Sequence, residues 1–115
     1  MEKFVLFAFN GDPMCFIHVL LNALNMQAKG FDVKIVMEGA AVKLLPELVK
    51  EDNPQKQLWE SVKSAQLVAG VCRACSHKLG TLKDAETQGL ALLSDMSGHP
   101  SMSQYISEGY RVITF

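Results

Sequence analysis

Residues 66–75 read QLVAGVCRAC, and this stretch is the most informative part of the chain. Its first six residues form an apolar run that predicts a buried strand, and Cys72 and Cys75 follow at once. The next residues predict a helical turn that ends at Gly80. In a parallel sheet, the point where a strand passes into a helix lies at the edge where ligands usually bind. A thiol at that point also meets the positive end of the helix dipole, which favours the thiolate.

Strands and helices alternate on both sides of this stretch. Apolar runs predict further strands at residues 3–9, 33–37, 89–94 and 110–115. Helices are predicted between them, starting near residues 13, 40, 54, 81 and 98, with Pro46 perturbing the second. This alternation predicts an α/β protein with a mainly parallel sheet. With 115 residues and no linker-like segment, the chain is predicted to form one domain, residues 1–115.

Composition narrows the classes of function. The net charge is −1 and the basic residues are scattered, which argues against direct nucleic-acid binding. No apolar run reaches the ~18 residues of a membrane helix, so we expect no membrane association and a cytoplasmic location. Three cysteines in a cytoplasmic chain argue against a disulfide framework. The 49% hydrophobic content is high for so short a chain, and it predicts that another subunit covers part of the surface.

Chemically active side chains are predicted to gather at one edge of the sheet. The residues that follow parallel strands all lie at the same edge. Here they include Cys15, Glu38, the segment from Cys72 to Cys75, and His99. The opposite edge carries little besides charged, solvated side chains. This asymmetry predicts a functional site at the carboxyl ends of the strands.

Cys72 is the candidate nucleophile. Arg73, Lys78 and the start of the helix would lower its pKa, whereas burial at the end of the strand would raise it. Cys75 has the Cys-x-x-Cys spacing of a dithiol and could resolve a disulfide or sulfenic acid on Cys72. The alternatives are that both thiols only pack, or that they bind zinc together with His77 and a further ligand, which could be His18, His99 or Cys15. A second pair of metal ligands at a recognisable spacing is absent from the sequence, so no metal or other cofactor is assigned.

Three other residues have both a chemical and a structural interpretation. Cys15, in the first turn of its helix, could use His18 as a base or could simply pack. Glu38 could hydrogen-bond a thiol or cap the following helix. His99 could supply a proton at the site or cap the last helix.

Three motifs along the chain carry a resemblance to a known family. They are Glu38–Val42 after the second predicted strand, Val71–Cys75 with Gly80 eight residues beyond Cys72, and the ending Tyr110–Phe115. These motifs resemble the DsrE/DsrF-like family, which includes the Dsr and Tus sulfur-relay proteins and the YchN-like small proteins. The likeness spans essentially the whole chain. It implies a three-layer α/β/α fold with a five-stranded parallel sheet, assembled as trimers or hexamers.

The resemblance also implies a chemistry. In the sulfur-relay members, one cysteine after the third strand carries a persulfide, and Cys72 matches that position by its distance from Gly80. Cys75 is a departure from the single-cysteine pattern. We therefore expect a sulfur carrier that takes sulfane sulfur on Cys72 from a donor protein and passes it to an acceptor. The second hypothesis is a non-enzymatic oligomer that binds a small ligand or serves a structural role, and the third is a zinc site.

Overall fold

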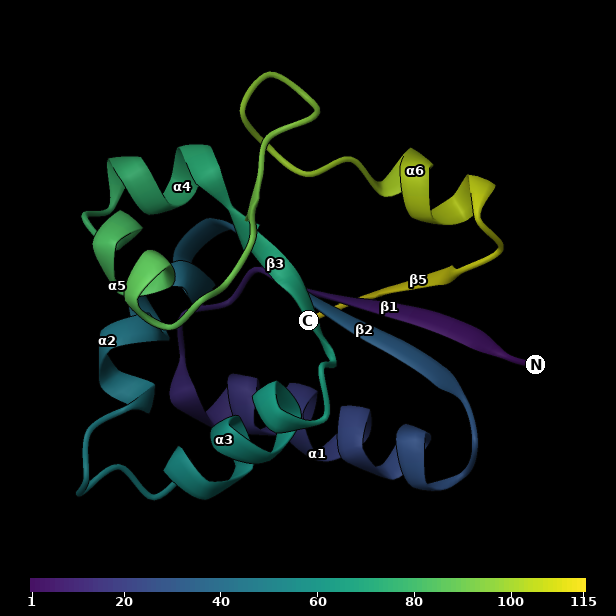
Figure 1. The fold of residues 1–115 in the computed structure, drawn as a ribbon, viewed down its shortest axis with the longest axis horizontal. Coiled ribbons are helices and arrows are strands. Elements are labelled where there is room, and N and C mark those ends of the chain that lie inside the picture. The colour runs from purple at the N-terminus through teal and green to yellow at the C-terminus, as the bar shows by residue number, and fades with distance from the viewer.

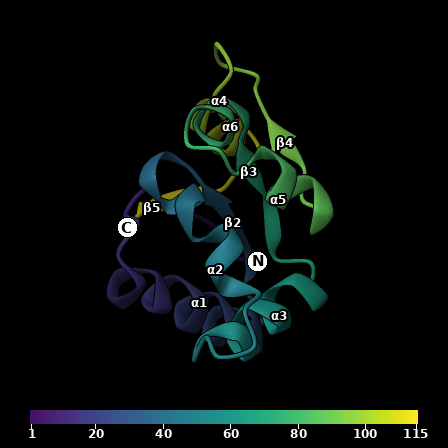
Figure 2. The same ribbon diagram turned by 90° about the vertical axis from the view of Figure 1, so that its left-hand side faces the viewer.

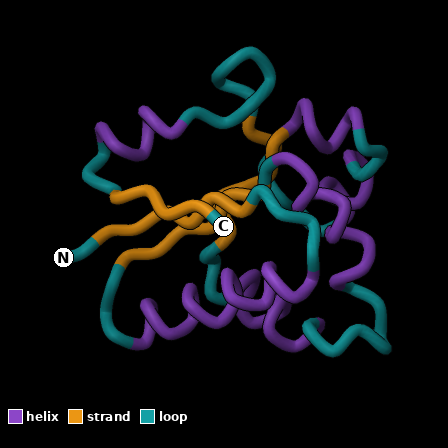
Figure 3. Tube along the Cα trace, turned by 180° about the vertical axis from the view of Figure 1, so that it is seen from behind, coloured by secondary structure: helices purple, strands orange, loops and turns teal.

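The structure, a computed structural model, describes residues 1–115 and contains one five-stranded sheet. The strands are β1 (Lys3–Ala8), β2 (Asp32–Met37), β3 (Val68–Cys72), β4 (Leu92–Leu93) and β5 (Arg111–Thr114). Their order is β4-β3-β2-β1-β5, and every pair of neighbours is parallel (Figure 1; β4 is labelled in Figure 2). With helices on both faces of this sheet, the predicted three-layer α/β/α class is confirmed (Figure 3).

The helical segments connect the strands in the predicted order. They are α1 (Pro13–Ala28), the 3₁₀ helix η1 (Gly39–Leu44), α2 (Leu45–Leu48), α3 (Lys56–Ser64), α4 (Arg73–Lys78), α5 (Leu82–Thr87) and α6 (Met102–Ser107). The start of α1 follows from its first residues. The Asp12 side chain accepts a hydrogen bond from the Met14 N–H, and Pro13 supplies a φ that suits the first turn.

Two predicted elements differ in extent. The helix expected from residue 40 is divided into η1 and α2, with Pro46 in the first turn of α2. The strand expected at residues 89–94 shrinks to Leu92 and Leu93. The backbone of β3 at Gly70 lies very close to residues 91 and 93. A Cβ at Gly70 would lie 2.7 Å from the Ala91 carbonyl oxygen and from Leu93 Cγ. Only glycine lets β4 lie this close to β3.

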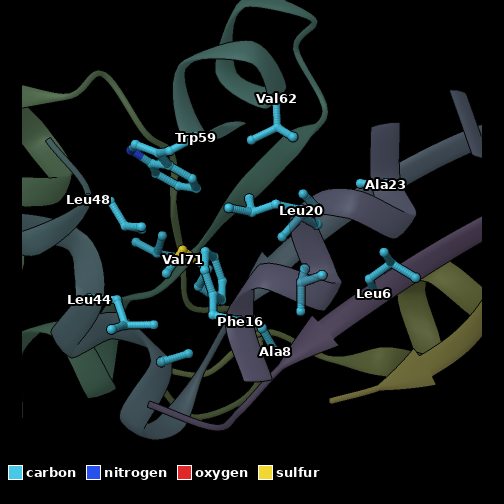
Figure 4. Packing of buried hydrophobic residues seen from close by; sticks show 14 of the residues in the cluster. Leu6, Ala8, Phe16, Leu20, Ala23, Leu44, Leu48, Trp59, Val62 and Val71 are labelled. Atoms are coloured by element: carbon cyan, nitrogen blue, oxygen red, sulfur yellow. The ribbon is translucent and has the colours of Figure 1, made fainter. Parts of the chain in front are cut away.

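One face of the sheet carries the main core. Nineteen buried residues form it, drawn from the sheet, α1, η1, α2, α3 and α5 (Figure 4). Phe16 on α1 packs against Trp59 on α3 with ring centroids 6.1 Å apart. The Trp59 Nε1–H donates to Gln88 Oε1 at 2.9 Å, and the Gln88 amide donates to the Leu45 carbonyl oxygen. The polar edge of the buried indole is therefore satisfied, and the helices on this face are tied together.

The other face is covered by α6 alone. Its core is a separate cluster of five buried residues: Val5, Phe7, Val36, Tyr105 and Tyr110. Figures 1 and 3 show α6 on the side of the sheet opposite α1 and α3. To reach that side, the chain leaves β4 and passes over the carboxyl edge of the sheet through residues 94–101, the loop that projects at the top of Figure 2. This crossing loop places its residues next to the end of β3.

Candidate functional site

Four of the residues expected at the carboxyl edge lie together. Cys72 is the last residue of β3, Cys75 lies in the first turn of α4, and Glu38 follows β2. His99 comes from the crossing loop. The two sulfur atoms and His99 Nδ1 all lie within 4.8 Å of one another. We call these four residues the thiol–imidazole cluster.

The two sulfurs are held by backbone N–H groups. The Cys75 N–H donates to Cys72 Sγ at 3.3 Å, because Cys72 occupies the N-cap position of α4. The Gly39 N–H, at the start of η1, donates to Cys75 Sγ at 3.3 Å. Each sulfur therefore accepts one hydrogen bond from a fixed donor. Such bonds favour negative charge on sulfur.

His99 reaches the sulfurs through a tight turn in the crossing loop. Met96 and His99 exchange two backbone hydrogen bonds, of 2.7 and 2.9 Å, across Ser97 and Gly98. Both central residues have positive φ, 50° at Ser97 and 90° at Gly98, as a type I′ turn requires. The Ala74 N–H donates to the Gly98 carbonyl oxygen at 2.9 Å and fastens the turn to the start of α4.

His99 Nδ1 is the centre of the cluster. It lies 3.1 Å from Cys72 Sγ, 3.7 Å from Cys75 Sγ and 3.5 Å from Glu38 Oε2. The Cys72 thiol has a second hydrogen-bond acceptor in the Gly98 carbonyl oxygen, at 3.8 Å. One ring nitrogen thus lies within reach of two thiols and a carboxylate, an arrangement that can move a proton or bind a cation.

Burial sets the ionisation of the cluster. It raises the pKa of the Cys72 thiol to about 12; the Cys75 N–H acts against this rise, and the Cys75 thiol and Glu38 add to it. The sequence predicted two opposing effects on the pKa of Cys72, nearby positive charge and burial, and burial is therefore the larger. Burial also raises the pKa of Glu38, and His99 opposes that rise. In this conformation Cys72 is a neutral thiol at neutral pH.

The two cysteines differ in access. Cys72 is fully buried, whereas Cys75 is half-buried and lines a pocket of about 410 Å³. Lys43, Lys78 and His99 line the same pocket. Glu38 lines a second hollow of about 350 Å³, together with Phe9 and residues 100–103. A reagent from solution would therefore meet Cys75 first.

The remaining candidate residues lie outside the cluster. Cys15 is half-buried in the first turn of α1, and its thiol makes no hydrogen bond with the exposed His18. Arg73 is exposed at the start of α4. Lys78 lies at the other end of α4, where it lines the pocket. Neither basic side chain forms a hydrogen bond with a thiol of the cluster.

Two capping interpretations are wrong. The Glu38 side chain makes no capping hydrogen bond to η1 and faces His99 instead. His99 does not cap the last helix, because α6 begins at Met102 with Ser101 in the N-cap position. The sequence interpretation also missed the turn at Ser97-Gly98, although a Ser-Gly pair is a recognised turn signal. That turn, rather than a helix start, is what delivers His99.

None of the helices combines the length and the apolar character that crossing a membrane requires.

Comparisons with known proteins place the chain in a family. The DsrE/DsrF-like family model matches residues 3–115. An uncharacterized protein of Methanocaldococcus jannaschii is 36% identical over 97 residues, which cover 84% of this chain and 77% of that protein. A short uncharacterized protein of Archaeoglobus fulgidus is 54% identical over 37 residues, which cover 32% of this chain and the whole of that protein.

A solved structure supports the same fold. A conserved protein of unknown function from Bacteroides thetaiotaomicron superimposes with a TM-score of 0.66 at 19% identity, covering 98% of this chain and 95% of that one. This likeness concerns the fold alone. The match of the family model over residues 3–115 leads to one conclusion: the chain belongs to the DsrE/DsrF-like family.

Proposed function

We propose that this protein is a sulfur carrier that accepts sulfane sulfur as a persulfide on Cys72 and passes it to a protein acceptor. Family membership suggests a sulfur-relay role. The observation that carries the proposal is the 3.1 Å contact between Cys72 Sγ and His99 Nδ1, because it gives a buried thiol a base within hydrogen-bond reach.

The transfer step needs no external oxidant. His99 Nδ1 takes the Cys72 proton, and the resulting imidazolium lies beside the Glu38 carboxylate. The thiolate attacks the outer sulfur of a donor persulfide, R–S–SH. The donor S–S bond breaks as the new one forms, and the donor leaves as a thiolate that takes up the proton held on His99. The products are the Cys72 persulfide and the donor thiol, so the sulfane sulfur keeps its oxidation state.

Cys75 is the entry point in this proposal: it takes sulfur from the donor by the same step, with His99 Nδ1 3.7 Å from its sulfur. It lines the pocket, whereas Cys72 is fully buried. Sulfur accepted by Cys75 moves inward when the Cys72 thiolate attacks the outer sulfur of the Cys75 persulfide, which leaves Cys75 as a thiol. Lys78, on the pocket wall, would attract an anionic persulfide donor, and Arg73 is available to a partner protein on the outer side of α4.

The test is intact mass spectrometry after incubation with glutathione persulfide in the presence of a chelator. We expect the wild type to gain one sulfur atom that a thiol reductant removes. Cys72→Ser should lose stable loading, Cys75→Ser should load more slowly, and Cys15→Ser is the matched control that should load as the wild type does. The proposal fails if Cys72→Ser loads as fast and as stably as the wild type.

A second candidate function is a non-enzymatic oligomer that binds a small ligand or serves a structural role. The burial that raises the pKa of Cys72 favours it, because a neutral thiol is a poor nucleophile. Native-state thiol titration separates the two functions. Slow reaction at all three cysteines, with no sulfur loading of the wild type, would favour the inert alternative.

Assembly and compartment belong to the same proposal. We infer a homo-oligomer, a trimer or a hexamer, in line with the family, and native mass spectrometry would give its size. We also infer a cytoplasmic location, because a reducing compartment would keep all three cysteines as the free thiols described above. Sulfur donor and acceptor proteins are the expected partners.

A further inference from the structure

The thiol–imidazole cluster also has the composition of a metal site. Two sulfurs from the junction of β3 and α4 and one imidazole nitrogen from the crossing loop lie within 4.8 Å of one another. We propose that Cys72, Cys75 and His99 bind a Zn²⁺ ion, with the Glu38 carboxylate next to the site as an additional negative charge. This inference goes beyond the proposed function, since it assigns a ligand that sulfur transfer does not require.

The spacing of the donor atoms supports a tetrahedral ion. With Zn–S about 2.3 Å and Zn–N about 2.0 Å, tetrahedral angles put sulfur and nitrogen about 3.5 Å apart. The distances from His99 Nδ1 to the two sulfurs, 3.1 and 3.7 Å, lie on either side of that value. Glu38 Oε2 is 3.5 Å from His99 Nδ1 but does not lie within 4.8 Å of both sulfurs, so a water molecule would complete the four ligands.

The surroundings of the cluster suit bound thiolates. The N–H groups of Cys75 and Gly39 donate to the two sulfurs, and such outer hydrogen bonds orient and stabilise metal-bound thiolates. The backbone bond from the Ala74 N–H to the Gly98 carbonyl holds the turn that bears His99. Little rearrangement is therefore needed to close a site around an ion.

The charges and the softness of the donors select the metal. Two thiolates balance the charge of a divalent ion in a buried place, and a neutral imidazole completes a donor set typical of zinc. Calcium and magnesium prefer oxygen donors, so this set disfavours them. The open pocket beside Cys75 and His99 gives the ion a path from solution.

Metal binding and sulfur loading would exclude each other. A Zn²⁺ ion held by both thiolates leaves neither sulfur free to attack a persulfide donor. The metal-bound protein is then a protected form, and loss of the ion exposes the carrier thiols. We therefore expect zinc to slow sulfur loading of the wild type and a chelator to restore it.

The first experiment is titration of the full chain with Co²⁺ and then Zn²⁺, without any sulfur donor. We expect one Co²⁺ per chain, a thiolate-to-cobalt charge-transfer band, and loss of that band when Zn²⁺ displaces the cobalt. Cys72→Ser, Cys75→Ser and His99→Ala should each weaken binding about a hundredfold, and Glu38→Gln about tenfold. Cys15→Ser is the matched control and should bind as the wild type does.

A second measurement needs no variant. Bound Zn²⁺ should protect Cys72 and Cys75 of the wild type from alkylation, while Cys15 reacts at an unchanged rate, as peptide mapping would show. Equal reaction of all three cysteines with and without Zn²⁺, or a cobalt band that persists in Cys72→Ser, would overturn the proposal. Because sulfur loading is measured in chelator and metal binding without a sulfur donor, each can fail alone.

Discussion

The face of the sheet under α1, α2 and α3 holds 19 buried hydrophobic residues, whereas the face under α6 holds five. The large cluster joins most of the chain, and its largest side chains, such as Trp59 and Phe16, are fully buried. The small cluster consists of three strand residues and two tyrosines. The face under α1, α2 and α3 therefore provides most of the stability of the fold. On the way to the other face, the chain crosses the sheet edge and brings His99 to the thiols.

Trp59→Ala tests the face of the sheet under α1, α2 and α3, and it should have the largest effect on stability. It removes a fully buried indole together with its hydrogen bond to Gln88, and it leaves a cavity beside Phe16. We expect a loss of about 3 to 5 kcal/mol in the free energy of unfolding. Urea denaturation followed by circular dichroism measures it. A loss below about 1 kcal/mol would mean that this face does not dominate stability.

Tyr105→Ala is the matching change on the face of the sheet under α6. Tyr105 makes edge-to-face contacts with Phe7, at 5.9 Å, and with Tyr110, at 6.0 Å. Because only the short α6 covers this cluster, the space left can be filled by movement of α6 or by water. We expect a loss of about 2 kcal/mol. The same denaturation experiment compares the two variants, and a loss as large as that of Trp59→Ala would remove the distinction between the faces.

Gly98→Ala tests the crossing loop that joins the two faces. Its φ of 90° disfavours any side chain, and the new Cβ would lie 3.2 Å from Ala74 Cβ. We expect a loss of about 1 to 2 kcal/mol, together with displacement of His99 from the thiols. The readouts are the resonances of the His99 imidazole in NMR spectra and the thermal unfolding curve. The control is Ser97→Gly, which relieves a positive φ of 50° at the neighbouring position and should not destabilise the protein.

Tyr110→Phe gives the smallest change and a pH signature. The Tyr110 hydroxyl donates to Asp32 Oδ2 at 2.8 Å, and burial together with this bond raises the pKa of Tyr110 to about 12. We expect a loss of about 1 kcal/mol at pH 7.

The raised pKa sets the direction of the pH dependence. The folded state keeps its proton where the unfolded chain, with a pKa near 10, has lost it. The contribution of Tyr110 to stability is therefore complete below pH 10 and falls as the pH rises towards 12. Wild type and Tyr110→Phe should converge in stability over this range. A constant difference between pH 8 and pH 12 would contradict this assignment.

Sequence patterns predicted the alternation of strands and helices, because periodicity and caps are local signals. Asp12-Pro13 marks the start of α1 within one residue. Local signals also placed Cys72 at the end of β3. They failed at β4, where close packing of Gly70 against residues 91 and 93 decides the short strand. They placed Glu38 and His99 at the site edge but left their roles open, because those roles depend on a contact between residues 61 positions apart.

Burial at Cys72 was predicted, but whether it outweighs the nearby positive charges in setting the pKa could not be predicted, for the same reason. A sequence shows which charges lie near a thiol along the chain, but not how much of the fold covers it. Arg73 is the next residue, yet it points to solvent, and the covering atoms include those of the crossing loop. The direction of the Cys72 pKa shift thus follows from tertiary structure.

The strand order has a consequence for synthesis on the ribosome. β1 pairs with β2 on one side and with β5 on the other, so its second edge stays open until residues 111–114 have been made. Both cluster cysteines leave the ribosome before His99, α6 and β5 do. The nascent chain therefore passes through a stage in which the thiols lack their imidazole neighbour and one edge of β1 is unpaired. Oxidation of the cysteines and edge-to-edge aggregation are the hazards of that stage.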